Sequence, residues 1–165
     1  ELVANPADNF SVNAGLAYNK AKVEQFRLPP GANAADLIPS GTPLANAPEW
    51  KFATGFDWTI ETGGFANVEL NGQLAMQSDQ IYELSPSAAV RRGSTVDGYA
   101  IVDLSAALVD QNDGWRVALQ VKNLFDKSFA SSIVSGGPGG AFRYIIPREA
   151  DRYFGITARV NFGGN

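Results

Sequence analysis

The acidic and glycine-rich segments are the parts of this chain whose residue types could support chemistry. Asp110 and Asp113 share one turn, and Glu149 and Asp151 lie close together before the last strand-like stretch, so both pairs could offer carboxylates for acid–base work. Residues 135–140 read Ser-Gly-Gly-Pro-Gly-Gly, but no lysine or helix follows them, as a phosphate-binding loop requires. Because aspartate commonly forms turns, we interpret the carboxylates as loop residues and the glycines as a flexible loop.

The composition removes several classes of function. The chain has no cysteine and no histidine, so Ser-His and Cys-His catalysis and thiolate metal sites are excluded. Its net charge is -4 and no basic cluster occurs, which argues against a nucleic-acid partner. An enzyme is therefore the class with the least support, and we expect no catalytic residue, cofactor or metal.

Length and hydropathy leave one kind of membrane protein open. The 165 residues fit a single domain. A mean hydropathy of -0.11 and the lack of any apolar run of about 20 residues rule out transmembrane helices. A membrane β-barrel passes this test, because half of its strand residues are polar. No signal segment opens the chain, so we expect a removed leader or an excerpt of a longer protein.

Strict alternation of apolar and polar residues predicts six long strands. In the last of them, Phe154, Ile156, Ala158, Val160 and Phe162 share one side, and polar or small residues share the other. We predict an all-β, antiparallel, up-and-down barrel wall with strands near 10–23, 50–61, 65–83, 98–109, 115–124 and 152–162. Each stretch has about the length of a tilted membrane strand. After Phe162 we expect a short disordered tail, Gly163-Gly164-Asn165.

The charged residues of these stretches all fall on the polar side. A charge facing lipid at the midplane costs about 2–4 kcal/mol, so a membrane strand requires this segregation. A soluble sheet with one face on a core requires it too, and the alternation leaves both interpretations open. We expect these charges to pair across strands within the wall: Lys51, Asp57, Glu69, Asp103, Arg116, Lys122 and Arg159.

The connections between the stretches favour the membrane interpretation. Residues 61–64 and 110–114 are tight turns, whereas long segments precede Trp50 and surround Pro86 and Gly137. Short and long connections therefore alternate, as they do at the two ends of an outer-membrane barrel. We assign the long loops to the extracellular side.

Aromatic residues near the strand ends give a second indication, because rings gather among lipid headgroups. Four lie near the short-turn end of the apolar side: Phe10, Trp58, Trp115 and Phe162. Five lie toward the long-loop end: Tyr18, Trp50, Phe52, Tyr82 and Phe154.

Residues 115–127, Trp-Arg-Val-Ala-Leu-Gln-Val-Lys-Asn-Leu-Phe-Asp-Lys, run from a strand into an asparagine-centred motif. Followed by a long loop and a final strand ending in phenylalanine, they resemble the C-terminal end of TonB-dependent outer-membrane receptors. The segments 47–50 and 99–104, and Pro147-Arg148 before Tyr153-Phe154-Gly155, are similar to other parts of that family's barrel. The resemblance spans nearly the whole chain.

This resemblance implies that residues 1–165 are the C-terminal β-barrel portion of a larger, 22-stranded receptor, without the plug domain. It implies a location in the outer membrane of a Gram-negative bacterium, surrounded by lipid and lipopolysaccharide. The implied partners are the rest of the barrel, the plug and the TonB system. The implied function is active import of a scarce nutrient, such as a metal–siderophore complex, cobalamin or a saccharide.

Candidate ligand contacts lie in the long loops: Arg91, Arg92, Phe142, Arg143 and Tyr144. We expect Asn123 and Asp126 to end a strand through side-chain bonds to the backbone. Gly155 either relieves crowding in the wall or belongs to a terminal signal for barrel insertion. Two other functions stay open: a passive porin-like or structural barrel, and a soluble all-β binding module.

Overall fold

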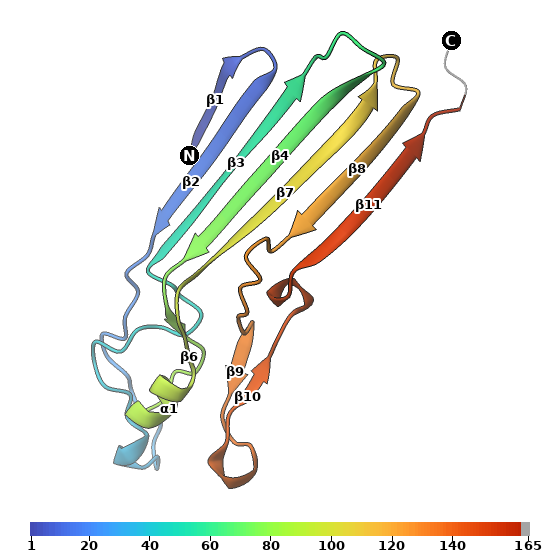
Figure 1. The fold of residues 1–165 in the computed structure, drawn as a ribbon. Coiled ribbons are helices and arrows are strands. Elements are labelled where there is room, and N and C mark those ends of the chain that lie inside the picture. Colours follow the sequence, from blue (N-terminus) through green and yellow to red (C-terminus); the bar gives the residue numbers. More distant parts are fainter. Residues whose placement is uncertain (163–165) are drawn as a thin grey trace.

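The structure is a computed structural model that describes residues 1–162. One curved antiparallel sheet dominates it, and three long connections extend from one end of that sheet (Figure 1). The tail expected at residues 163–165 lies outside the described residues.

Seven strands form the sheet in the order β1-β2-β3-β4-β7-β8-β11, and every neighbouring pair is antiparallel. Their bounds are Leu2–Ala7 (β1), Phe10–Tyr18 (β2), Trp50–Ile60 (β3), Ala66–Gln77 (β4), Tyr99–Asp110 (β7), Trp115–Lys122 (β8) and Tyr153–Val160 (β11). The predicted all-β, antiparallel fold class is confirmed.

The strand register keeps the two faces of the sheet separate. Phe10 pairs with Trp58, Leu70 with Ala106, and Ala106 in turn with Leu119. Because a slip of one residue would turn every apolar side chain to the opposite side, this register is strongly specified by the sequence. We call the side that carries these residues the apolar face, and the opposite side the polar face.

The alternation predicts six strands, and β1 is a seventh strand that this pattern does not reveal. This segment reads Leu-Val-Ala-Asn-Pro-Ala, and its register against β2 shifts between Ala4 and Ala7. Proline cannot donate a hydrogen bond to a sheet and is tolerated on an edge strand, which is where β1 lies. The short, interrupted alternation explains why the pattern was not recognised.

Two predicted strands end earlier than expected. The stretch near 10–23 leaves the sheet after Tyr18, and the stretch near 65–83 leaves after Gln77. At those points the amides of Asn19 and Ser78 bind the carbonyls of Glu49 and Trp50, and the chain then turns into a loop.

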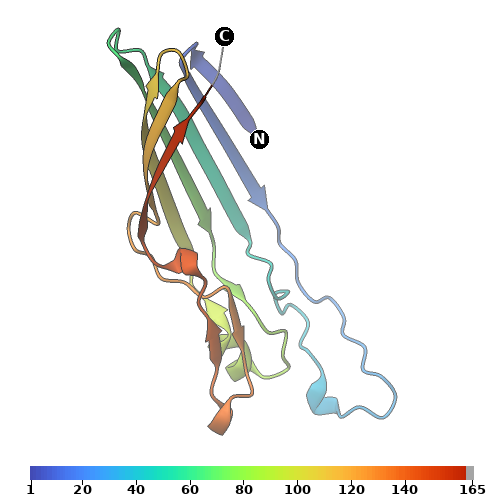
Figure 2. The same ribbon diagram turned by 90° about the vertical axis from the view of Figure 1, so that its right-hand side faces the viewer.

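Short turns lie at one end of the sheet and long loops at the other (Figure 2). We name the long connections the first loop (19–49), the second loop (78–98) and the third loop (123–152). They contain the remaining elements: η1 (Ala34–Asp36), β5 (Gln80–Ile81), α1 (Ala88–Gly93), β6 (Thr95–Val96), β9 (Ser132–Val134), η2 (Pro138–Gly140), β10 (Arg143–Ile145) and η3 (Arg148–Ala150).

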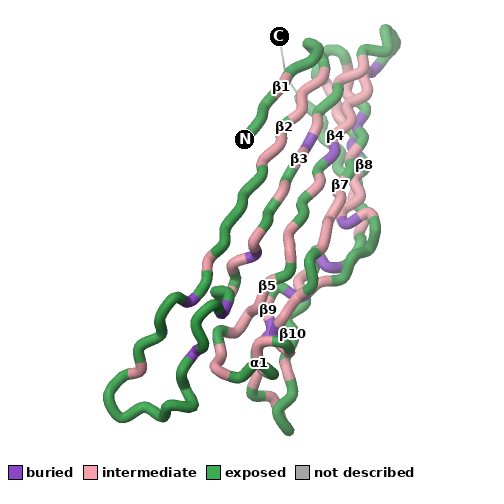
Figure 3. The backbone as a smooth tube through the Cα atoms, turned by 90° about the vertical axis from the view of Figure 1, so that its left-hand side faces the viewer, coloured by how far each residue is buried: buried purple, intermediate pink, exposed green. Residues whose placement is uncertain are grey.

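Within residues 1–162 neither face of the sheet is covered by a second layer, so the strands carry few buried residues (Figure 3). On the apolar face Leu16, Leu119, Phe154 and Ile156 are 64%, 57%, 76% and 76% exposed. Several of the buried side chains belong instead to the loops, among them Val23, Ile38 and Ile133. Within residues 1–162, no helix is long and apolar enough to cross a membrane.

Candidate functional site

Charged side chains on the polar face pair between strands, in one case across an intervening strand. Arg116 on β8 donates two hydrogen bonds to Oε2 of Glu69 on β4, at 3.1 and 3.0 Å. Lys122 binds Asp103 on the adjacent strand at 2.9 Å. The predicted pairing within the wall is therefore confirmed for these four of the seven residues.

A polar ladder runs across the middle of the same face. Asn71 on β4 donates to the carboxylate of Asp57 on β3 and accepts a hydrogen bond from Ser105 on β7 at 3.1 Å. Asp57 thus finds an amide partner in place of a cation. Lys51 forms no salt bridge within the described residues, and Arg159 binds only the amide oxygen of Asn161.

The polar face is hollowed toward the long-loop end by a cavity of about 670 Å³. Its lining includes Lys51 and Gln77, which pair in register, and Tyr99, the next residue across the sheet. The ring of Tyr99 stacks on Phe129 of the third loop, with centroids 4.4 Å apart. Nε2 of Gln77 is buried without a hydrogen-bond partner within residues 1–162.

Hydrogen bonds and a packing contact join the second and third loops. The hydroxyl of Tyr82 donates to the carbonyl of Ala130 at 2.9 Å. The carboxylate of Glu83 accepts both the amide and the hydroxyl of Ser135, the latter at 2.7 Å. The ring of Phe142 packs so closely on Gly93 that any side chain there would overlap it. The first loop joins this assembly through the amide of Asn46, which binds the carbonyl of Ile81.

These contacts separate the five candidate loop residues into two groups. The guanidinium of Arg91 donates to the carbonyls of Ser85 and Pro86, and Phe142 packs on Gly93, so both stabilise the loops. The other three candidates are exposed: Arg92, Arg143 and Tyr144. Arg143 and Tyr144 are consecutive on β10, so their side chains point to opposite sides of that strand.

Tyr82 does not lie on the apolar face, and its assignment to the aromatic girdle is corrected. The strand expected to carry it ends at Gln77, and Tyr82 follows β5 within the second loop. Its ring is partly buried and its hydroxyl is bound to the third loop. Sequence alternation continued past the true end of the strand, which explains the error.

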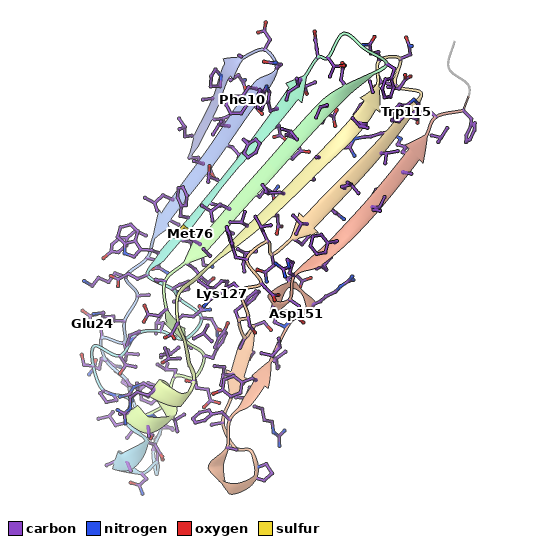
Figure 4. The ribbon with its side chains drawn as sticks, viewed as in Figure 1. Phe10, Glu24, Met76, Trp115, Lys127 and Asp151 are labelled. Carbon is purple, nitrogen blue, oxygen red and sulfur yellow. The ribbon has the colours of Figure 1, made fainter. Side chains whose placement is uncertain are left out.

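Other aromatic residues of the apolar face pair across strands near its ends. At the short-turn end Phe10 and Trp58 meet edge to face, with ring centroids 6.2 Å apart. At the long-loop end the ring centroids of Tyr18 and Trp50 lie 4.2 Å apart. Figure 4 shows Phe10 and Trp115 toward the short turns and Met76 toward the long loops. Phe65, which is not among the predicted girdle residues, stacks on Trp115 with ring centroids 6.2 Å apart.

Asn123 ends β8 and pins both ends of the third loop. It is 1% exposed and has a positive φ of 51°, a conformation that asparagine tolerates better than most residues. Its side chain accepts the amide of Lys127 at 2.8 Å and donates to the carbonyls of Lys127 and Glu149, both at 3.1 Å. The predicted strand-ending role is confirmed, and Asp126 adds a bond to the amide of Arg152.

Gly155 lies beneath the side chain of Gln120, and a Cβ atom there would come within 2.7 Å of Nε2. This geometry supports the interpretation that glycine relieves crowding.

Among the candidate carboxylates, Asp110 has a structural role, because it accepts hydrogen bonds from the amides of Asn112 and Gly114 in its turn. Across the described part of the chain, no three potential metal ligands gather.

A single curved sheet with one apolar and one polar face, aromatic pairs near its ends, and turns and loops sorted to opposite ends is the architecture of a β-barrel wall. A family profile described as "TonB dependent receptor-like, beta-barrel" matches residues 1–124. The chain belongs to this family, which consists of outer-membrane transport receptors of Gram-negative bacteria rather than enzymes. Part of the asparagine-centred motif, Phe125-Asp126, lies beyond the matched residues.

Two solved structures are similar to this chain. The ferric yersiniabactin uptake receptor FyuA from Yersinia pestis aligns with a TM-score of 0.75 and 14% identity, over 98% of this chain and 22% of that receptor. The ferric-catecholate import receptor Fiu from E. coli K12 aligns with a TM-score of 0.70 and 21% identity, over 97% of this chain and 20% of that receptor. At such identities the likeness establishes the fold alone. No curated protein matches the chain.

Proposed function

We propose that this chain forms part of the wall of an outer-membrane receptor that imports a scarce nutrient with energy delivered by TonB. The observation that carries the proposal is the division of the sheet into an uncovered apolar face and a hollowed polar face. The apolar face suits contact with the hydrocarbon of a bilayer, and the polar face suits a water-filled lumen.

The two open edges of the sheet support a larger barrel. In the part of the chain that the structure describes, β1 and β11 each have one neighbour in the sheet, so their outer backbone groups lack strand partners. Such edges are not tolerated in lipid, and further strands would satisfy them. We propose that residues 1–165 are one segment of a larger barrel, and that the remaining strands and a plug are its partners.

The cavity on the polar face would line the lumen near the extracellular mouth. Its aromatic pair, Tyr99 and Phe129, would contact the plug or the imported molecule. Arg92, Arg143 and Tyr144 are the loop side chains we propose for first contact with that molecule, because they are exposed. The girdle comprises Phe10, Trp58, Trp115 and Phe162 at one end, and Tyr18, Trp50, Phe52 and Phe154 at the other.

Uptake by cells with and without the encoding gene tests this proposal. Labelled ferric–catecholate complexes, cobalamin and oligosaccharides would be supplied separately to the parent strain, the deletion strain and a strain that lacks TonB. We expect one class to enter only when both the gene and TonB are present. Uptake that needs the gene but not TonB would indicate a passive pore, and a chain extracted without detergent would indicate a soluble module.

A further inference from the structure

Two arginines before β11 lie on opposite faces of the sheet. The guanidinium carbon of Arg148 lies 4.8 Å from the ring centroid of Tyr153, and that of Arg152 lies 6.0 Å from the ring centroid of Phe154. Tyr153 pairs with Lys122 on the polar face, whereas Phe154 pairs with Val121 on the apolar face. Arg152 is therefore a cation on the apolar side, at the long-loop end.

Arg152 is held in place without being neutralised. Its amide donates to Asp126 at 2.8 Å, and its Nη1 donates to the carbonyl of Leu124 at 3.3 Å. Within residues 1–162 no carboxylate lies at salt-bridge distance from the guanidinium. Asp126 binds the backbone of this residue rather than its side chain. The guanidinium keeps donors free for an anion.

An apolar slot of about 380 Å³ opens on the same face beside Phe154. Leu104, Leu119 and Val121 contribute to its lining, with Ala106 between the longer side chains of Leu70 and Leu119 in register. Because the side chain of Ala106 is small, a depression remains between Leu70 and Leu119. Since Phe154 both lines the slot and lies under Arg152, the slot and the cation form one continuous surface.

We propose that this surface binds a phosphorylated glycolipid of the outer leaflet, with an acyl chain in the slot and a phosphate on Arg152. The inference rests on the proposed function, because the apolar face must meet lipid and the long loops must lie outside. Arginine suits this role because its planar guanidinium binds phosphate through two parallel hydrogen bonds. A cation just beyond an aromatic ring at the bilayer boundary lies at the depth of lipid headgroups.

Native mass spectrometry of the intact receptor in detergent, titrated with purified bisphosphorylated lipid A, tests the proposal. We expect Arg152→Gln to weaken binding about fivefold, the effect of removing one cation at a lipid surface. Ala106→Leu fills the slot and should also weaken binding, although it leaves every charge in place. Arg148→Gln is the matched control, because it removes the same charge from the opposite face and should bind as the parent does.

The proposal fails if Arg152→Gln binds lipid A as the parent does, or if Arg148→Gln loses as much affinity. It also fails if phosphatidylethanolamine or inorganic phosphate competes as well as lipid A. Should Arg152→Gln fold poorly, Arg152→Lys and Ala106→Leu supply the comparison. A receptor that leaves the membrane fraction without detergent would overturn the proposed function itself, whereas a detergent-dependent receptor indifferent to Arg152 would overturn only this inference.

Discussion

Arg116 on β8 reaches across β7 to Glu69 on β4, with Nη2 and Oε2 3.0 Å apart. The residue of β7 opposite Glu69 is Ala107, whose small side chain leaves room for this crossing. Arg116 also lies directly opposite Arg159 of β11 in the register. Glu69 therefore links β4 to β8 across β7, and it pairs with one of two arginines that face each other in the register.

Replacing Glu69 by glutamine should destabilise the folded barrel by about 1 kcal/mol. The side chains of Arg116 and Glu69 are 37% and 32% exposed, so water screens the attraction, and the like-charged pair Arg116–Arg159 adds to the loss. Urea unfolding of the intact receptor in lipid vesicles measures the effect, which should shrink as salt is raised.

The arginine pair supplies the control for that prediction. Adding Arg159→Gln to the Glu69→Gln variant should restore part of the lost stability, because it removes the facing positive charge. If the double variant is less stable than Glu69→Gln, repulsion between the two arginines is not part of the effect.

Gly72→Ala should destabilise the sheet by about 1–3 kcal/mol, because the added methyl group would overlap the ring of Phe56 on the neighbouring strand. Gly15→Ala is the matched control: it also lies in a strand, and its Cβ would meet nothing within 4 Å. Thermal unfolding in detergent should shift for the first variant alone. Phe56→Leu in the Gly72→Ala background should recover part of the shift.

Asn123→Ala should destabilise the base of the third loop by about 2–4 kcal/mol, since three side-chain hydrogen bonds are lost from a buried position. Limited proteolysis of intact receptors should cut residues 123–152 faster in this variant. Asn112→Ala in an exposed turn is the control and should be cut like the parent. Equal cleavage of all three proteins would contradict the pinning role.

Glu83→Ala should loosen the third loop relative to the second, because Ser135 loses the acceptor for its amide and its hydroxyl. Hydrogen–deuterium exchange should rise in the peptide that contains Ser135, by the loss of about one to two hydrogen bonds. Asp97→Ala removes an exposed acid of the second loop, which also contains Glu83, and should leave the exchange at Ser135 unchanged. Exchange that is equal in both variants would show that the loops are not held together by Glu83.

The division of the sheet was predictable because the alternation of side chains in a strand is local and has a period of two. Each stretch, such as residues 153–160, shows which side chains share a face without reference to any other strand. β1 could not be recognised, since Pro6 and a register shift interrupt a pattern of only six residues. Tyr82 was misplaced for the converse reason, because alternation persisted after β4 had ended.

The sequence by itself determined the two faces, the order of short and long connections and the absence of histidine and cysteine chemistry. Only the tertiary structure decided that Tyr82 and Glu83 bind the third loop through hydrogen bonds. It also decided that Gln77 and Tyr99 line one cavity, and that Arg148 and Arg152 lie on opposite faces of the sheet. The physical reason is the distance along the chain that separates the residues involved in each feature. Strand patterning arises between residues two apart, whereas these contacts depend on how segments distant in the chain, or neighbouring strands, are brought together.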